Sequence, residues 1–292
     1  MTLLKLALTS LFWAALLFLG KVALSGMSPA SVSAWRFLLA SAVLLPLIHK
    51  RVGMDWRGLC RHWLVLTVMS IIGIVMFNLA LFEGLKQTST VNAALIMGLC
   101  PIMIAILSAA LTGEGIRHAT GIGLLVSLSG AVLVITGCSR EKLMDMSFHN
   151  GDLNVLIAAG CWAVYSALPR RFMPELAPQQ ITTATVSLGA IFIASYAALT
   201  QQDFMVWPSL SVAASIIAVS LFGTVLVFLW WNEGVQKIGP QRAAPFMNVV
   251  PLFAMLIGFA LGEDITIAQV MGGLLVVAGV GLGLQSSRKE MT

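Results

Sequence analysis

A few polar and aromatic side chains stand inside long apolar stretches of this sequence, at spacings that suit the binding of a small solute. Asn78 and Phe82 are four residues apart, and so are Phe228 and Asn232. Residues four apart are neighbours on one face of a helix. Aromatic rings can contact an apolar solute, and amides can donate and accept hydrogen bonds without a buried charge. The pattern therefore predicts noncovalent binding.

Other candidates follow the same logic. Trp162 and Tyr165 are three residues apart, Trp13 lies in the first apolar run, and Phe246 and Asn248 shortly precede a proline. Packing is the alternative for each, because amides also bond neighbouring helices or carbonyls freed by a proline, and aromatic residues also anchor spans at the interface or fill the core. The predicted substrate-binding residues are Trp13, Asn78, Phe82, Trp162, Tyr165, Phe228, Asn232, Phe246 and Asn248.

The apolar stretches hold no residue pattern typical of catalysis. They contain no HExxH or GxSxG motif and no pair of acids, so we expect no enzyme. The four histidines lie between the runs and the four cysteines have no CxxC spacing, so no metal and no cofactor is expected. No aspartate or glutamate stands at the centre of a run, which disfavours proton relay by carboxylates. Glu83 and Glu233 lie near run ends, and Glu114 and Glu263 close the fourth and ninth runs. We expect these acids to be interfacial caps or partners for basic residues.

The candidates recur because the chain repeats one plan. NLALFEGL begins at Asn78, and FLWWNEGV begins 150 residues later. Pro101 and Pro251 are also 150 residues apart, and each is followed by a Gly-Glu pair. Such an offset indicates an internal duplication. We expect both prolines to kink their helices and act in gating.

Composition determines the elements that hold these residues. The chain has 292 residues, 59% hydrophobic and 10% charged, with a mean hydropathy of +0.94. Soluble domains have about 25% charged residues, so this is an all-α protein of the lipid bilayer. Its net charge of +5 arises from basic residues in gaps between the runs, which argues against nucleic acid as a partner. The predicted spans are about 3–24, 30–48, 63–85, 91–112, 120–138, 151–168, 178–199, 210–236, 241–261 and 267–284.

Ten spans divide into two halves of five, and the odd number per half makes the halves inverted in the membrane. We expect a first repeat over residues 1–139, a connecting loop over 140–150 and a second repeat over 151–292. The first run resembles a signal peptide, but Trp13 has a repeat partner in Trp162, so we expect this run to be kept.

The basic residues indicate the orientation. With both termini in the cytoplasm, twelve of the seventeen lysines and arginines lie on the cytoplasmic side, and five lie outside or within spans. This count favours cytoplasmic termini.

Several motifs together resemble the EamA-type ten-helix exporters of the drug/metabolite transporter superfamily. The motifs are Trp13 followed by Lys21, the pair Arg36-Phe37, and the prolines Pro101 and Pro251, followed by Gly113-Glu114 and Gly262-Glu263. The resemblance covers residues 6–284. The second half departs from it, because Thr185 stands where the repeat would place Arg36 and Pro169 precedes the basic residue of the sixth span.

The resemblance implies a secondary transporter of the cell (inner) membrane. It would export small amphipathic metabolites, above all amino acids of broad range, by alternating access through a central cavity. We expect a functional monomer, with facilitated or exchange transport. One alternative is a multidrug exporter of hydrophobic cations, although the first span lacks the glutamate that tiny drug exporters of the superfamily use. Another is a membrane assembly or sensor protein without transport, although no gap is long enough for a soluble domain.

Overall fold

The computed structural model describes residues 1–113, 115–139 and 150–285, and all regular structure in these ranges is helical. Ten of its helical stretches are long and apolar enough to cross a membrane. The predicted all-helical membrane fold with two five-helix repeats is confirmed.

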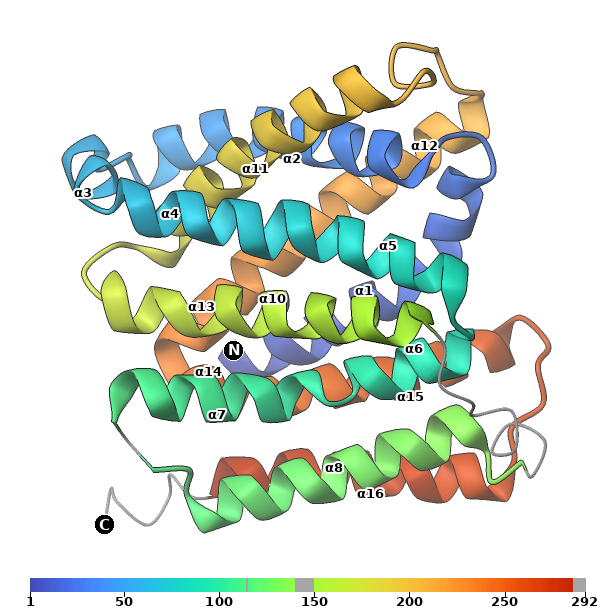
Figure 1. The fold of residues 1–292 in the computed structure, drawn as a ribbon. Helices are drawn as coiled ribbons and strands as arrows, with labels where there is room; N and C mark the ends of the chain where they lie inside the picture. The colour runs from blue at the N-terminus through green and yellow to red at the C-terminus, as the bar shows by residue number, and fades with distance from the viewer. Residues whose placement is uncertain (114, 140–149, 286–292) are drawn as a thin grey trace.

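The first half contains α1 (Thr2–Leu24), α2 (Pro29–Arg51), α3 (Trp56–Arg61), α4 (Trp63–Ser70), η1 (Ile71–Met76), α5 (Phe77–Gln87), α6 (Thr90–Met97), α7 (Cys100–Thr112) and α8 (His118–Thr136). The second half contains α10 (Asn150–Phe172), α11 (Pro178–Thr200), α12 (Leu210–Ser220), η2 (Leu221–Leu226), α13 (Val227–Ile238), α14 (Pro240–Ala243), η3 (Ala244–Val249), α15 (Val250–Ala260) and α16 (Ile267–Gln285). Short loops join most of them (Figure 1).

Local sequence sets several of these boundaries. The Ser28 side chain accepts a hydrogen bond from the Ser31 N–H, and Pro29 occupies the first position of α2, both of which favour a helix start. α7 ends at Thr112 and is followed by Gly113, where φ is 73°, a left-handed conformation that glycine adopts without strain.

The third span of each half contains a π-helical segment at the same repeat position. η1 begins at Ile71 and η2 begins 150 residues later at Leu221. A Cβ added at Gly73 would lie 2.4 Å from the Tyr165 ring, and one added at Gly223 would lie 2.5 Å from Leu16. Leu16 and Tyr165 are themselves repeat mates, so the two halves make the same close contact. The duplication therefore extends to backbone detail.

The fourth span of each half is interrupted just before its proline. α6 and α7 are separate helices with Pro101 in the first turn of α7, and the 3₁₀ segment η3 precedes Pro251 in the first turn of α15. The sequence places these prolines within continuous spans. In the structure neither removes an intrahelical bond, because the N–H groups of a first turn have no partner in their own helix.

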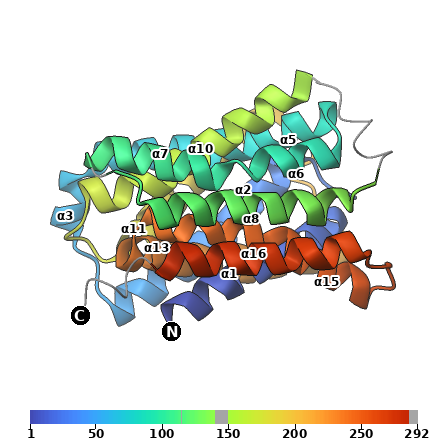
Figure 2. The same cartoon turned by 90° about the horizontal axis from the view of Figure 1, so that it is seen from below.

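The two halves interlock. α8 packs along α16 and α2 along α11, and Figures 1 and 2 show the first of these pairs side by side in both views. α1 packs against α12, α13 and α15 of the second half, whereas α10 packs against α5, α6 and α7 of the first. A Cβ on Gly130 of α8 would lie 2.5 Å from the Val276 nitrogen of α16, so this pair approaches backbone to backbone.

Candidate functional site

Aromatic rings from both halves meet in the middle of the molecule. Trp13 of α1 and Trp162 of α10 make an edge-to-face contact with centroids 5.5 Å apart. Because these two residues are repeat mates, their contact lies at the pseudo-twofold axis that relates the halves. Trp162 stacks on Tyr165 at 5.2 Å and contacts Phe228 edge-on at 5.4 Å. We call Trp13, Trp162, Tyr165, Phe228 and Trp231 the aromatic cluster.

Helix geometry places the cluster at mid-depth. Trp13 is eleven residues into α1 and Trp162 is twelve residues into α10, and each helix has 23 residues. At about 1.5 Å per residue, both rings lie about 17 Å from the helix start, near the centre of a bilayer core of about 30 Å. The spacing of Trp162 and Tyr165 directs both rings to one face, as the sequence indicates.

Two buried polar atoms at the cluster have no hydrogen-bond partner within the described protein. The Asn232 side chain is fully buried, and its Nδ2 donates to Tyr165 Oη at 2.9 Å and to Thr182 Oγ1 at 2.8 Å. Its Oδ1 has no partner, and neither has Trp162 Nε1, although Trp162 is only 2% exposed. An unpaired buried polar group costs about 1–3 kcal/mol. Asn232 bonds Tyr165 and Trp162 stacks on it, so the unpaired acceptor and the unpaired donor belong to side chains next to the same ring.

The remaining predicted residues make no ring contact or hydrogen bond to the cluster in the part of the chain that is described. Asn78 Nδ2 donates to the Ile74 carbonyl of its own helix at 2.7 Å. Asn248 Nδ2 donates to Ser127 Oγ of α8 at 2.9 Å, a contact between helices. Phe246 is buried, and its carbonyl accepts from Ser10 Oγ. Phe82 is half-buried.

The structure adds one residue, Trp231, to the four predicted members of the cluster. Trp231 is fully buried, lies 5.3 Å from Trp13 and donates from Nε1 to Ser166 Oγ at 3.0 Å. Its neighbour Trp230 points away and contacts Phe12. Consecutive residues diverge by about 100° on a helix, so the sequence predicts that only one can face inward, without indicating which.

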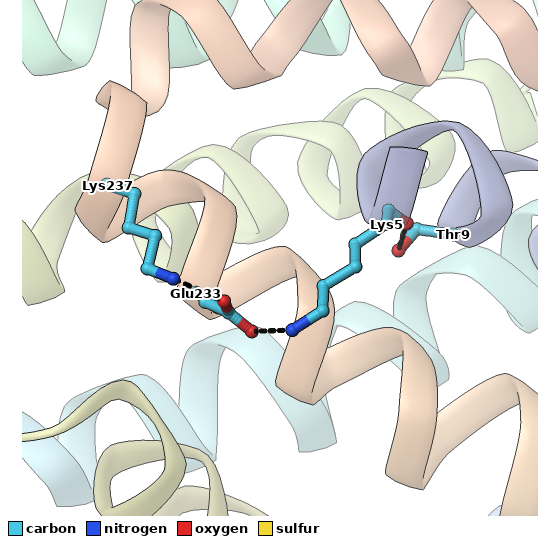
Figure 3. Close-up of polar contacts among 4 residues, drawn as sticks. All are labelled: Lys5, Thr9, Glu233 and Lys237. Carbon is cyan, nitrogen blue, oxygen red and sulfur yellow. Dashed lines mark hydrogen bonds and ion pairs between the residues drawn. The ribbon is translucent and has the colours of Figure 1, made fainter. Parts of the chain in front are cut away.

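Glu233 joins the beginning of α1 to the end of α13. Its carboxylate is buried and lies 2.6 Å from the Lys5 ammonium on one side and 2.6 Å from the Lys237 ammonium on the other (Figure 3). Its repeat mate Glu83 pairs instead with Lys86 of the same helix at 3.0 Å. Glu83 and Glu233 are thus both partners of basic residues, one of the two roles expected for these acids. Glu114 lies outside the described residues.

A second buried carboxylate, Asp152, lies in the first turn of α10. It accepts a hydrogen bond from Asn92 Nδ2 at 3.3 Å and another from the Thr88 hydroxyl. An acid suits this place, because a helix N-terminus carries partial positive charge. Both buried carboxylates of the described residues therefore lie near span ends. No group of three potential metal ligands occurs within the described ranges.

Comparison with known proteins gives consistent results over nearly the whole chain. Residues 1–136 and 149–284 match the EamA-like transporter family model. "Uncharacterized transporter YyaM" of Bacillus subtilis (strain 168) is 37% identical over 272 residues, which cover 93% of this chain and 89% of that protein. "Aromatic amino acid exporter YddG" of Ancylobacter novellus is 27% identical over 216 residues, 70% of this chain and 72% of that one. A solved crystal structure with 24% identity has the same fold, with a TM-score of 0.81 and 98% of both chains covered.

Proposed function

Because the chain belongs to the EamA-like transporter family, we propose that it exports amino acids and similar small amphipathic metabolites across the cell (inner) membrane. Family membership makes it a multi-pass membrane transporter and not an enzyme. The proposal adds the substrate class and the direction. The observation that carries the substrate class is the aromatic cluster with its unpaired donor and acceptor.

An amino acid fits these two atoms chemically. Its ammonium group can donate to Asn232 Oδ1, and its carboxylate can accept from Trp162 Nε1. The surrounding rings of Trp13 and Phe228 suit an apolar side chain of almost any shape, since one methylene in an apolar pocket changes binding by only about 1–3 kcal/mol. We therefore expect a broad range of neutral amino acids. The relative named as an aromatic amino acid exporter supports the same class.

Alternating access is the transport mode that the duplication supports best. Trp162 and Asn232 are almost completely buried, so a solute reaches them only if helices around the cluster separate. Inverted repeats can do this by exchanging conformations, which opens first one side and then the other. We propose that the helix breaks before Pro101 and Pro251 act as the gating points, and that a single chain forms the whole pathway.

A transport assay in liposomes tests the proposal against its alternatives. Purified protein is reconstituted, and counterflow of radiolabelled phenylalanine, leucine and serine is compared with that of a hydrophobic cationic dye. Amino acids should exchange and the dye should not. Dye movement without amino-acid movement would favour a drug exporter, and no flux of any solute would favour an assembly or sensor protein.

A pair of amide variants links this flux to the site. Asn232→Ala should reduce the flux of every transported amino acid, because it removes the free acceptor. Gln202→Ala, a change at an exposed loop amide, is the matched control and should leave flux unchanged. Equal flux from both variants would place the substrate elsewhere.

A further inference from the structure

We propose that Arg36 holds the anionic group of the transported solute, so that the protein selects molecules bearing a carboxylate over hydrophobic cations. The inference rests on the proposed function and narrows its substrate class. Arg36 lies in α2, seven residues after Pro29, about 10 Å along the helix and hence within the span.

The guanidinium is only partly satisfied by the protein. Nε donates to Thr224 Oγ1 at 2.6 Å, and Nη2 donates to the Gly223 carbonyl at 3.2 Å. These are two of the five N–H groups that an arginine carries. Both acceptors are neutral, and no described carboxylate lies within ion-pair distance of Arg36. The residue as a whole is half-buried.

A single unbalanced charge in a span is costly and is therefore a functional candidate. Lys5 differs from Arg36 in this respect, because it forms an ion pair with the Glu233 carboxylate. An arginine with a neutral shell keeps its full positive charge for an external anion. Its planar fork also suits a carboxylate, because two N–H groups can bond the two oxygens in parallel.

The molecule contains its own control for the structural alternative, in which Arg36 only stabilises the π-helical segment η2. The first half forms the equivalent segment η1, and α11 of the second half packs against it. In α11 the repeat position of Arg36 is occupied by Thr185. Thr185 Oγ1 donates to the Ile181 carbonyl of its own helix. A π-helical segment therefore forms in this fold without an arginine beside it.

The rings next to Arg36 connect it to the aromatic cluster. The guanidinium carbon lies 5.0 Å from the centre of the Phe37 ring, and Phe37 contacts Phe228 edge-on at 5.9 Å. Phe228 in turn contacts Trp162. An anion held at Arg36 would thus lie beside the cluster, towards the Pro29 end of α2. In this arrangement Arg36 takes the carboxylate in place of Trp162 Nε1, and an apolar group attached to the carboxylate could reach the rings.

Three ligands with the same phenyl ring separate charge from shape. Phenylalanine carries both charges, 3-phenylpropionate only the carboxylate, and phenethylamine only the ammonium. In the purified full-length protein, the two carboxylates should raise the melting temperature and compete with labelled phenylalanine, and phenethylamine should do so far less. Equal effects of all three ligands on the parent protein would overturn the inference.

Variants of Arg36 complete the test. Arg36→Gln should raise KM for phenylalanine by at least roughly tenfold, with a smaller change in kcat, and should abolish the preference for carboxylates. Thr224→Val removes a partner of Arg36 but keeps the guanidinium, so it should keep the preference. Should Arg36→Gln fail to fold, Arg36→Lys should keep the preference with a raised KM, and an unchanged KM would contradict the proposal.

The two proposals fail differently. If the parent carries phenylalanine and Arg36→Gln does so with unchanged KM, only the role of Arg36 is overturned. If the parent carries cationic dyes and no amino acid, the proposed function is overturned, and the role of Arg36 with it.

Discussion

At the scale of single residues, the most informative side chain is Trp162, because it combines a central ring with a buried N–H that has no partner. Trp162→Ala should impair transport of large aromatic substrates more than of small ones, since an aromatic solute loses a ring contact that a small solute does not make. KM values for phenylalanine and serine, measured in liposomes, check this. Trp207→Ala, a change at a ring that is 87% exposed, is the control. An equal loss for both substrates would mean that Trp162 is a packing residue.

Asp203, in the loop between α11 and α12, ties that loop to the start of α2. It accepts from the Ser28 N–H, from Ser28 Oγ at 2.9 Å and from Ser31 Oγ at 2.8 Å. Burial alone would raise the pKa of this carboxyl, but the hydrogen bonds outweigh burial and leave the pKa below its ordinary value. A lowered pKa means that the folded state is stabilised at neutral pH and loses this stabilisation as the pH falls through the folded-state pKa.

Thermal unfolding of the purified protein should reveal this contribution. Asp203→Asn should lower stability by about 1 kcal/mol at neutral pH and reduce the loss of stability seen on acidification below about pH 4. Identical pH dependence of the melting temperature in parent and variant would show that the contact contributes nothing.

Sequence patterns identify some of the residues of the candidate site but not all of their contacts. Helical spacing and repeat offset identify Trp13, Trp162, Tyr165 and Phe228, which the structure brings into one cluster. The same reasoning cannot separate amides that pair within the protein, such as Asn248, from one with a free oxygen, such as Asn232. That difference depends on partners from distant helices, which spacing along one helix does not contain.

At the scale of elements, the close pair α8–α16 depends on missing side chains. Gly130→Ala should destabilise the protein by about 1–3 kcal/mol, because the new Cβ would lie 2.5 Å from backbone nitrogen of α16. Gly281→Ala is the matched control, since a Cβ there meets nothing within 4 Å. Melting temperatures in detergent distinguish the two. Equal values would show that the helices can move apart at little cost.

The breaks before Pro101 and Pro251 can be tested by alanine. An N–H at these positions could bond a preceding carbonyl and favour one continuous α-helix across each break. We expect Pro101→Ala and Pro251→Ala to fold normally and to slow the initial rate of counterflow. Pro174→Ala, at an exposed loop position, serves as the control. Normal rates in both span variants would show that the breaks are passive.

The π-helical segments are the element that sequence reasoning does not find. No residue type specifies π-helical bonding, and the duplication predicts only that a feature of one half should recur in the other. Gly73 and Gly223 are the residues in the sequence that mark these segments, because each leaves space for a side chain from another helix. Span positions, by contrast, follow from hydropathy and agree with the helices.

At the scale of the whole molecule, two native cysteines can report the orientation. Cys60 in α3 and Cys138 after α8 are exposed, whereas Cys100 and Cys161 are buried. With both termini in the cytoplasm, a membrane-impermeant maleimide added to intact cells should label Cys138 and leave Cys60 unlabelled. Variants that retain one exposed cysteine separate the two signals. Labelling of Cys60 alone would reverse the orientation. A cysteine introduced near Met144, in the loop between the two halves, should also be labelled from outside, and this position lies outside the described residues.

The contact of Lys5 with Glu233 has a consequence for the resting protein. If the two halves were identical in sequence, the inward-open and outward-open conformations would have equal energy. The halves differ here, because Glu233 pairs with Lys5 of another helix, whereas its repeat mate Glu83 pairs with Lys86 of its own helix. Each inequality of about 1.4 kcal/mol shifts the two populations tenfold. In the proposed cycle the site of the empty protein is therefore open mainly to one side of the membrane. A single ion pair near a helix end can determine which side that is.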